Sequence, residues 1–238
     1  MNLFSKLNFF YSRKIEPGFK INKKDLVVDI GSGDKPFWRA DVFVDKLSLG
    51  NVQRASNTRT IHDLGYFVDS DVSHMPFKTG AFDFSFCSHL LEHVEDPGAV
   101  IREITRISRS GYMEIPNGII ETIIPFDSHL WFVFQDNKKL VFVRKSKKLH
   151  EVLLSNGKKY EATHSNISEP FIRLYWKKSI EYEIIDPYKE SEKFQSKIGE
   201  SKSHKVPHFD PYLMLVKAVR IFSHKDRPSL ELAKMVQK

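Results

Sequence analysis

The feature that most constrains this chain is the run at residues 26–36, Leu-Val-Val-Asp-Ile-Gly-Ser-Gly-Asp-Lys-Pro. Its first five residues are apolar and rich in β-branched side chains apart from Asp29, and two glycines separated by Ser32 follow. The pattern predicts a buried parallel strand that enters a tight turn, because glycine tolerates close approaches that a Cβ would forbid. Asp29 is a carboxylate inside this strand, so we expect backbone N–H groups of the glycine turn to satisfy it.

Two acids follow the next predicted strands. Asp45 closes the run 41–45, which predicts the second strand, and Asp71 follows the run 65–68, which predicts the third. A strand followed by Gly-x-Gly is typical of a nucleotide-type ligand, and an acid ending the second strand accepts hydrogen bonds from ribose hydroxyls. An acid after the third strand can accept from an adenine amino group. Pro36 replaces the third glycine of the dinucleotide fingerprint, which argues for an adenosine ligand without a pyrophosphate.

Four motifs in sequence order resemble the class I S-adenosylmethionine-dependent methyltransferases. They are Asp-Ile-Gly-Ser-Gly at 29–33, the acid Asp45, the segment 71–77 followed by Ala-Phe-Asp-Phe at 81–84, and the segment 87–97. The resemblance covers roughly residues 25–117. It implies an S-adenosylmethionine cofactor and methyl transfer, and it leaves the acceptor open. The residues expected around the cofactor are Asp29, Gly31, Ser32, Gly33, Asp45, Lys46, Asp71, Val72, Ser88 and His89.

The remaining pattern predicts an α/β fold with a doubly wound, mostly parallel Rossmann-like sheet. Further strands are expected at 82–87 and 111–115, with a helix between them that Asp96 caps and Pro97 begins. Five strands with crossovers make a parallel sheet, and ligands bind beyond the carboxyl ends of such strands. Only residues 32–40 separate the glycine turn from the second strand, so the first crossover helix is expected to be short and irregular.

The second half of the chain predicts additions to this sheet. Extended runs at 129–135 and 140–144 flank a four-residue turn and resemble the antiparallel pair that completes the family's sheet with seven strands. Runs at 171–176 and 180–185 predict a second hairpin, and 212–222 predicts a very apolar helix. The expected organisation is a basic N-terminal helix at 1–24, a cofactor-binding core at 25–145, a helix and hairpin addition at 146–186, a polar linker at 187–207 and a C-terminal apolar and basic helix at 208–238.

The segment His89-Leu-Leu-Glu-His93 also matches H-x-x-E-H, an inverted zinc-peptidase signature. Zinc would require both histidines on one helical face, and a helix is hard to fit between the strand ending near Cys87 and the cap at Asp96. The methyltransferase resemblance accounts for the same segment, so no metal is expected. A general base is needed only if the acceptor is protonated, and the candidates are His89, His93, Glu114 and His129.

The net charge of +7 is unevenly distributed. Residues 25–118 carry 9 Lys and Arg against 14 Asp and Glu (net −5), residues 1–24 carry 6 against 1 (+5), and residues 119–238 carry 22 against 15 (+7). One interpretation is a surface of solvated lysines. The other is an anionic acceptor or a phosphate-bearing partner, either a membrane surface contacted through the C-terminal helix or, less favoured, nucleic acid. The sequence does not indicate an oligomeric state.

Several function classes are disfavoured by the composition. The single cysteine, Cys87, allows no internal disulfide and suits a reducing cytoplasm. No apolar run reaches the roughly 18 residues of a membrane span, and Lys6 and Asn8 interrupt the apolar N-terminal segment, which makes it a poor signal peptide. Two alternatives to an active methyltransferase stay open. One is an inactive S-adenosylmethionine-binding protein, and the other is a nicotinamide-dependent oxidoreductase, which the short Gly-x-Gly and Asp71 disfavour.

Overall fold

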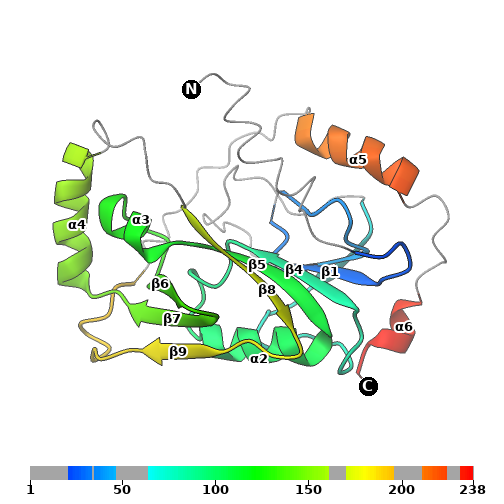
Figure 1. Cartoon of the computed structure of the whole chain (residues 1–238), viewed down its shortest axis with the longest axis horizontal. Helices are drawn as coiled ribbons and strands as arrows, with labels where there is room; N and C mark the ends of the chain where they lie inside the picture. Colours follow the sequence, from blue (N-terminus) through cyan, green and yellow to red (C-terminus); the bar gives the residue numbers. More distant parts are fainter. Residues whose placement is uncertain are drawn as a thin grey trace.

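The computed structural model describes residues 21–33, 35–46, 64–160, 170–195, 211–223 and 231–237. Within them, a main sheet of six strands has the order β3-β2-β1-β4-β5-β8 (Figure 1). Its strands are β1 (Val27–Ile30), β2 (Val42–Asp45), β3 (Tyr66–Asp69), β4 (Phe84–Ser88), β5 (Ser110–Pro116) and β8 (Phe171–Lys177). The first five are parallel, and β8 pairs with β5 antiparallel. The strand order reverses between β1 and β4, so the predicted Rossmann-like α/β fold class is confirmed.

Local sequence explains the central strands and the helix that covers them. Every residue of β1 and β4 is buried, as expected for apolar strands covered on both faces. The described helices are α2 (Pro97–Ile107), α3 (Gly118–Ile123), α4 (Lys147–Tyr160), α5 (Pro211–Ser223) and α6 (Leu232–Met235). The side chain of Asp96 caps α2 by accepting a hydrogen bond from the Ala99 N–H at 2.8 Å, and Pro97 is the first helical residue. The predicted capped helix is therefore confirmed.

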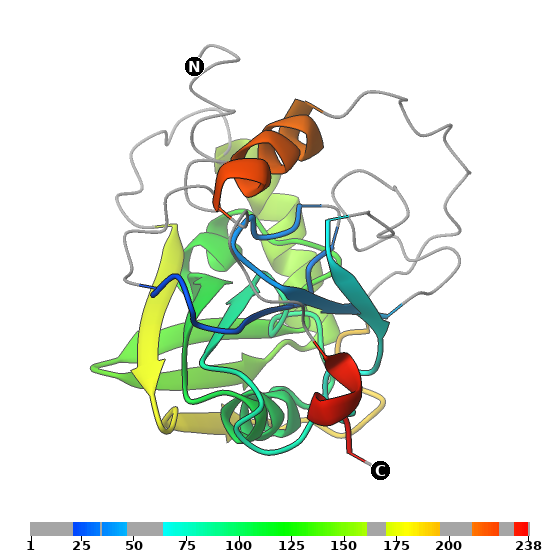
Figure 2. The same ribbon diagram turned by 90° about the vertical axis from the view of Figure 1, so that its right-hand side faces the viewer.

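Helices α2 and α5 lie on opposite sides of the main sheet (Figures 1 and 2). Helix α5 inserts Val216, which is fully buried, into a cluster with Phe37 and Phe43. Arg220 of α5 donates hydrogen bonds to the carbonyls of Trp38 and Ala40 and lies over the Phe43 ring. Burial lowers the pKa of Arg220 to about 10. The apolar C-terminal helix is therefore anchored on this chain, although its far side stays exposed.

We expect Val216→Ala to lower the free energy of unfolding by about 2 kcal/mol, because it removes buried methyl groups and leaves a cavity under α5. The neighbouring Leu215 is half exposed, so Leu215→Ala is the matched control and should change stability by less than about 0.5 kcal/mol. Urea unfolding followed by circular dichroism measures both variants. Equal stability of Val216→Ala and the parent would show that α5 does not dock where the structure places it.

The second half of the chain departs from the prediction. Strands β6 (Trp131–Asp136), β7 (Lys139–Arg144) and β9 (Tyr182–Ile185) form a separate three-stranded sheet, with β9 parallel to β7. The predicted antiparallel pair is present as β6 and β7, but its place in a seven-stranded main sheet is wrong. The predicted hairpin at 171–185 is also wrong, because β8 pairs with β5 whereas β9 pairs with β7. Strand β8 buries alternate residues only, which suits an edge strand with one covered face.

Other segments differ less from the sequence-based prediction. Residues 31–33 and 35–41 contain no helix, whereas a short and irregular helix was expected in the first crossover. Helix α4 (Lys147–Tyr160) lies at the start of the segment 146–186, where a helix was predicted. Phe194, predicted to lie in a polar linker, is buried, and its N–H donates to the Lys145 carbonyl at 2.9 Å. Residues 1–20 of the predicted N-terminal helix, residues 47–63 of the predicted core and residues 196–207 of the predicted linker lie outside the described residues. The domain boundaries stay predictions.

A helix that crosses a membrane needs roughly 18 or more predominantly apolar residues. None of the helices in the part of the chain that the structure describes could cross a membrane.

Candidate functional site

The glycine turn is fixed to the end of β2. Gly31 and Gly33 have φ angles of +69° and +55°, which side-chain-bearing residues rarely adopt. The N–H groups of Gly31 and Ser32 donate to the Val44 carbonyl at 2.9 and 3.2 Å, and the Gly33 N–H donates to Asp45 Oδ2 at 2.8 Å. The turn and the strand-end acid predicted to bind the cofactor therefore form one unit.

Asp29 has a different partner from the one predicted. It is buried, and its Oδ2 accepts a hydrogen bond from the Phe37 N–H at 2.7 Å. The N–H groups of the glycine turn go to Val44 and Asp45 instead. The N–H of Phe37, and not an N–H of residues 31–33, is thus the observed donor to Asp29 Oδ2, and this bond ties Asp29 to the short crossover after the turn.

The other predicted cofactor residues gather at the carboxyl edge of the main sheet. Asp45 Oδ1 accepts from the Lys46 N–H at 2.7 Å, and Lys46 Nζ lies 3.5 Å from Asp71 Oδ2. Asp71 Oδ1 accepts from the hydroxyl and the N–H of Ser73 at 2.6 and 2.9 Å, and these bonds lower the pKa of Asp71. Val72 packs partly buried against the main core. The edge therefore carries two acids with Lys46 between them.

Two serines at this edge carry unsatisfied hydroxyl groups. Ser32 and Ser88 are buried, and among the described residues their Oγ atoms have no hydrogen-bond partner. A buried hydroxyl normally finds a partner, because leaving it unsatisfied costs about 1–3 kcal/mol. Ser32 lies in the glycine turn and Ser88 ends β4, so both lie where a ligand of this sheet would bind.

The four predicted catalytic candidates belong to one polar cluster, made of His89, Glu92, His93, Glu114, Glu121, His129 and Lys145. His89 follows β4 with a φ of +55°. Its Nε2 lies 3.5 Å from Glu114 Oε1, and its Nδ1 lies 3.4 Å from Glu92 Oε1. Burial opposes the charged imidazolium, but the two carboxylates outweigh it and raise the pKa of His89 to about 9. His89 is therefore a cation at neutral pH.

His93 and His129 meet edge to face, with ring centroids 4.7 Å apart. His93 Nδ1 lies 2.9 Å from the Ser128 carbonyl, and His129 Nδ1 lies 2.7 Å from Glu121 Oε2. Burial lowers the pKa of His93, which keeps the ring neutral at neutral pH. Glu121 also accepts from the fully buried Lys145 and from the Phe126 N–H at 2.7 Å. His93 and His129 are thus held by contacts to the Ser128 carbonyl and to the Glu121 carboxylate.

Glu114 joins the polar cluster to the sheet edge. Its Oε2 accepts from the Tyr112 hydroxyl at 2.8 Å and lies 3.4 Å from Arg173 Nε. Burial and the nearby carboxylate raise the pKa of Tyr112, so its hydroxyl stays a donor. Glu114 is therefore bound on both sides, by His89 and by Arg173.

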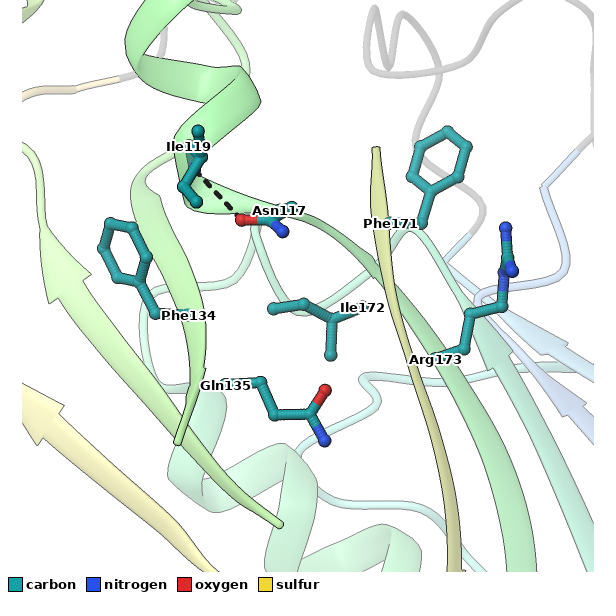
Figure 3. A pocket seen from close by; sticks show the side chains of 7 residues that line it. All are labelled: Asn117, Ile119, Phe134, Gln135, Phe171, Ile172 and Arg173. Atoms are coloured by element: carbon teal, nitrogen blue, oxygen red, sulfur yellow. Dashed lines mark hydrogen bonds between the residues drawn. The ribbon is translucent and has the colours of Figure 1, made fainter. Parts of the chain in front are cut away.

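A pocket with a volume of about 430 Å³ opens beside this cluster, and Figure 3 shows the side chains that line it. The lining residues come from the end of β5, from α3, from β6 and from β8: Asn117, Ile119, Phe134, Gln135, Phe171, Ile172 and Arg173. Phe171 is opposite Pro116 at the carboxyl end of β5, and its ring meets His89 with centroids 5.0 Å apart. The pocket therefore adjoins the edge where the predicted cofactor residues lie.

Sequence reasoning missed several residues of this region. Glu92 lay inside the H-x-x-E-H segment, but only the histidines were considered as candidates. No sequence pattern indicated that Glu121 and Lys145 are buried, because their burial depends on contact between α3 and the second sheet. Phe171 and Arg173 lie on a strand whose partner was mispredicted. A correct pairing of β8 with β5 would have placed Phe171 opposite Pro116 and Arg173 opposite Glu114.

Part of the chain is similar to a known protein family. Residues 30–113 match the family model described as a methyltransferase domain. No curated protein matches the chain.

Three solved structures are among those similar to this chain. A methyltransferase from Thermotoga maritima, described as a possible histamine N-methyltransferase, is 14% identical over 74% of this chain and 90% of its own, with a TM-score of 0.41. A methyltransferase in complex with the Haloferax volcanii activator Trm112 is 16% identical over 56% of this chain and 74% of its own (TM-score 0.38). One from an antibiotic biosynthesis pathway of Anabaena variabilis is 11% identical over 47% of each chain (TM-score 0.37), so this chain spans less than half of that protein. The match of residues 30–113 to a methyltransferase domain and the Rossmann-like order of the described strands agree with the class I methyltransferase resemblance of the sequence motifs.

Proposed function

We propose that the protein binds S-adenosylmethionine at the carboxyl edge of the main sheet and transfers its methyl group to a small acceptor. The observation that carries the proposal is the joined unit of glycine turn and Asp45, within a segment that matches a methyltransferase domain. The positive-φ glycines keep side chains out of the turn, and the unsatisfied hydroxyls of Ser32 and Ser88 fit a ligand at this edge. The cofactor would supply an activated methyl group as a sulfonium. The protein would supply position and the exclusion of water.

The pocket beside β5 is the proposed acceptor site. Its volume of about 430 Å³ is in the range of small-molecule sites. Phe134, Phe171 and Ile119 offer apolar surface, and Arg173 offers a fixed positive charge on one wall (Figure 3). This lining supports an acceptor with an apolar body and an anionic group, and it favours a small molecule over nucleic acid or a membrane surface. Glu114 is the proposed residue to accept an acceptor proton, and the cationic His89, which contacts both Glu114 and Phe171 of the pocket, is proposed to position the acceptor.

We expect Arg173→Gln to slow methyl transfer by about 10- to 100-fold, because hydrogen bonds to a charged group contribute about 1.5–3 kcal/mol each. Its affinity for S-adenosylhomocysteine should stay within about twofold of the parent, since a separate edge would bind the cofactor. Lys177→Gln, an exposed position on the same strand, is the matched control for both measurements. Transfer is measured as label from methyl-labelled S-adenosylmethionine that enters the small molecules of a cell extract, and affinity is measured by calorimetry.

Three outcomes of this experiment separate the candidate functions. Binding of S-adenosylhomocysteine without any labelled product, in every extract tried, would favour an inactive binding protein. Thermal stabilisation by NAD and not by S-adenosylhomocysteine would favour an oxidoreductase. Equal transfer by Arg173→Gln and Lys177→Gln would remove Arg173 from the acceptor site without affecting the proposal for the cofactor.

A further inference from the structure

Three side chains of the polar cluster converge around one point. Glu92 and His93 lie in the loop between β4 and α2, and His129 lies just before β6. Each offers one ligand atom, and these three atoms lie within 4.8 Å of one another. Glu92 and His129 are buried, and His93 is partly buried. The three residues come from two segments that only the tertiary fold brings together.

The hydrogen bonds of the two histidines fix which ring nitrogen faces this point. A carbonyl oxygen can only accept, so His93 Nδ1, 2.9 Å from the Ser128 carbonyl, carries the proton. His129 Nδ1 donates in the same way to the Glu121 carboxylate at 2.7 Å, and Lys145 holds that carboxylate in its ionised form. When the single proton of an imidazole ring is on Nδ1, the lone pair is on Nε2. Metal-ligating histidines are oriented by this kind of hydrogen bond, to a carboxylate or a backbone carbonyl.

The third side chain is a buried carboxylate that lacks hydrogen bonds. Both oxygens of Glu92 are inaccessible to solvent, and neither has a hydrogen-bond partner among the described residues. Glu92 Oε1 lies 3.8 Å from His93 Nε2, and the proton of that ring is on the opposite nitrogen. A negative oxygen and a nitrogen lone pair that face each other without a proton between them repel, and a cation placed there would remove the repulsion.

We propose that Glu92, His93 and His129 bind a divalent transition-metal ion of the zinc type. Two imidazole nitrogens and one carboxylate oxygen form a ligand set that zinc uses, and a three-residue set leaves a further position open. The proposal departs from the sequence-based expectation of no metal. It also differs from the H-x-x-E-H pattern, because His129 from a distant segment takes the place of His89. His89 provides the competing arrangement, since its Nδ1 is 3.4 Å from Glu92 Oε1 and its charge can balance the carboxylate without a metal.

Zinc titration of the full-length protein tests the proposal. After removal of metals with a chelator, the parent should bind one equivalent of zinc, measured by competition with a chromophoric chelator. Glu92→Gln and His93→Asn should each weaken this binding by at least about 100-fold, because removing even an outer-sphere partner costs about 10- to 100-fold in metal affinity. His74→Asn, which changes an exposed histidine outside the cluster, should bind zinc as the parent does.

Two results would overturn the inference. A folded, metal-free parent that takes up no zinc would show that His89 alone balances Glu92. Zinc uptake that both ligand variants retain would place the metal elsewhere. If the variants do not fold, cobalt substitution of the parent decides the matter: visible bands of a low-symmetry, nitrogen-ligated Co²⁺ support the site, and their absence contradicts it. None of these measurements depends on methyl transfer. The metal proposal can therefore be contradicted while the proposed methyltransferase function holds, and the metal site can be confirmed even if methyl transfer is not observed.

Discussion

Replacing Asp45 with alanine is expected to weaken the binding of S-adenosylhomocysteine by about 100-fold or more. The carboxylate ends β2 half-buried at the carboxyl edge of the sheet, where two oxygens can accept from the two ribose hydroxyls. Each hydrogen bond to a charged group is worth about 1.5–3 kcal/mol, and each 1.4 kcal/mol is tenfold in affinity. The structure adds a second reason, since Asp45 Oδ2 also holds the Gly33 N–H at 2.8 Å. The substitution would release the glycine turn as well as the ribose contact.

A series of variants tests this assignment by calorimetry. Asp45→Asn keeps one acceptor oxygen and should lose less affinity than Asp45→Ala. Asp71→Ala should lose less again, because an adenine amino group needs one acceptor and backbone atoms can partly substitute. Asp136→Ala removes an acid that ends a strand of the second sheet, so it is the matched control and should bind as the parent does. The assignment of the cofactor edge is wrong if Asp45→Ala stays folded and binds S-adenosylhomocysteine with parental affinity.

The first half of the fold was predictable because its signals are local. Strands β1 to β5 are short runs rich in apolar residues, and all except β4 end in or directly before a glycine, an acid or a proline; the N-cap of α2 is visible as Asp96-Pro97. The order of such strands follows from the family resemblance and from the right-handed connections of parallel sheets. The position of Asp45 and Asp71 at the carboxyl edge of the sheet was predictable for the same reason, since Asp45 ends β2 and Asp71 closely follows β3.

The second half was not predictable in this way. Two apolar runs separated by a short polar stretch predict a hairpin, but 177–181 joins strands of different sheets. The choice of partner strand depends on packing between segments far apart in the chain, for example Gly111 of β5, where a Cβ would approach the Trp176 ring of β8 to 2.8 Å. Periodicity cannot encode such a contact. The burial of Lys145 and of Glu121 depends in the same way on the approach of α3 to the second sheet.

Replacing the buried Lys145 with methionine is expected to lower the free energy of unfolding by about 3–5 kcal/mol, the range found when one partner of a buried ion pair is removed. Lys145 is fully buried and bonds the buried Glu121. Burial lowers the pKa of Lys145, while the histidine and lysine bonds hold the pKa of Glu121 below its ordinary value against the opposing effect of burial. Without Lys145, Glu121 would keep His129 and the Phe126 N–H, but its negative charge would lose its fixed cation.

Chemical unfolding of three variants separates the loss of a charge pair from the loss of packing. Lys148→Met changes an exposed lysine on α4 and should alter stability by less than about 0.5 kcal/mol. Lys145→Met combined with Glu121→Gln removes both charges, so it should recover part of the loss seen in the single variant, because no uncompensated charge stays buried. A single Lys145→Met variant as stable as Lys148→Met would mean that the pair is hydrated in solution.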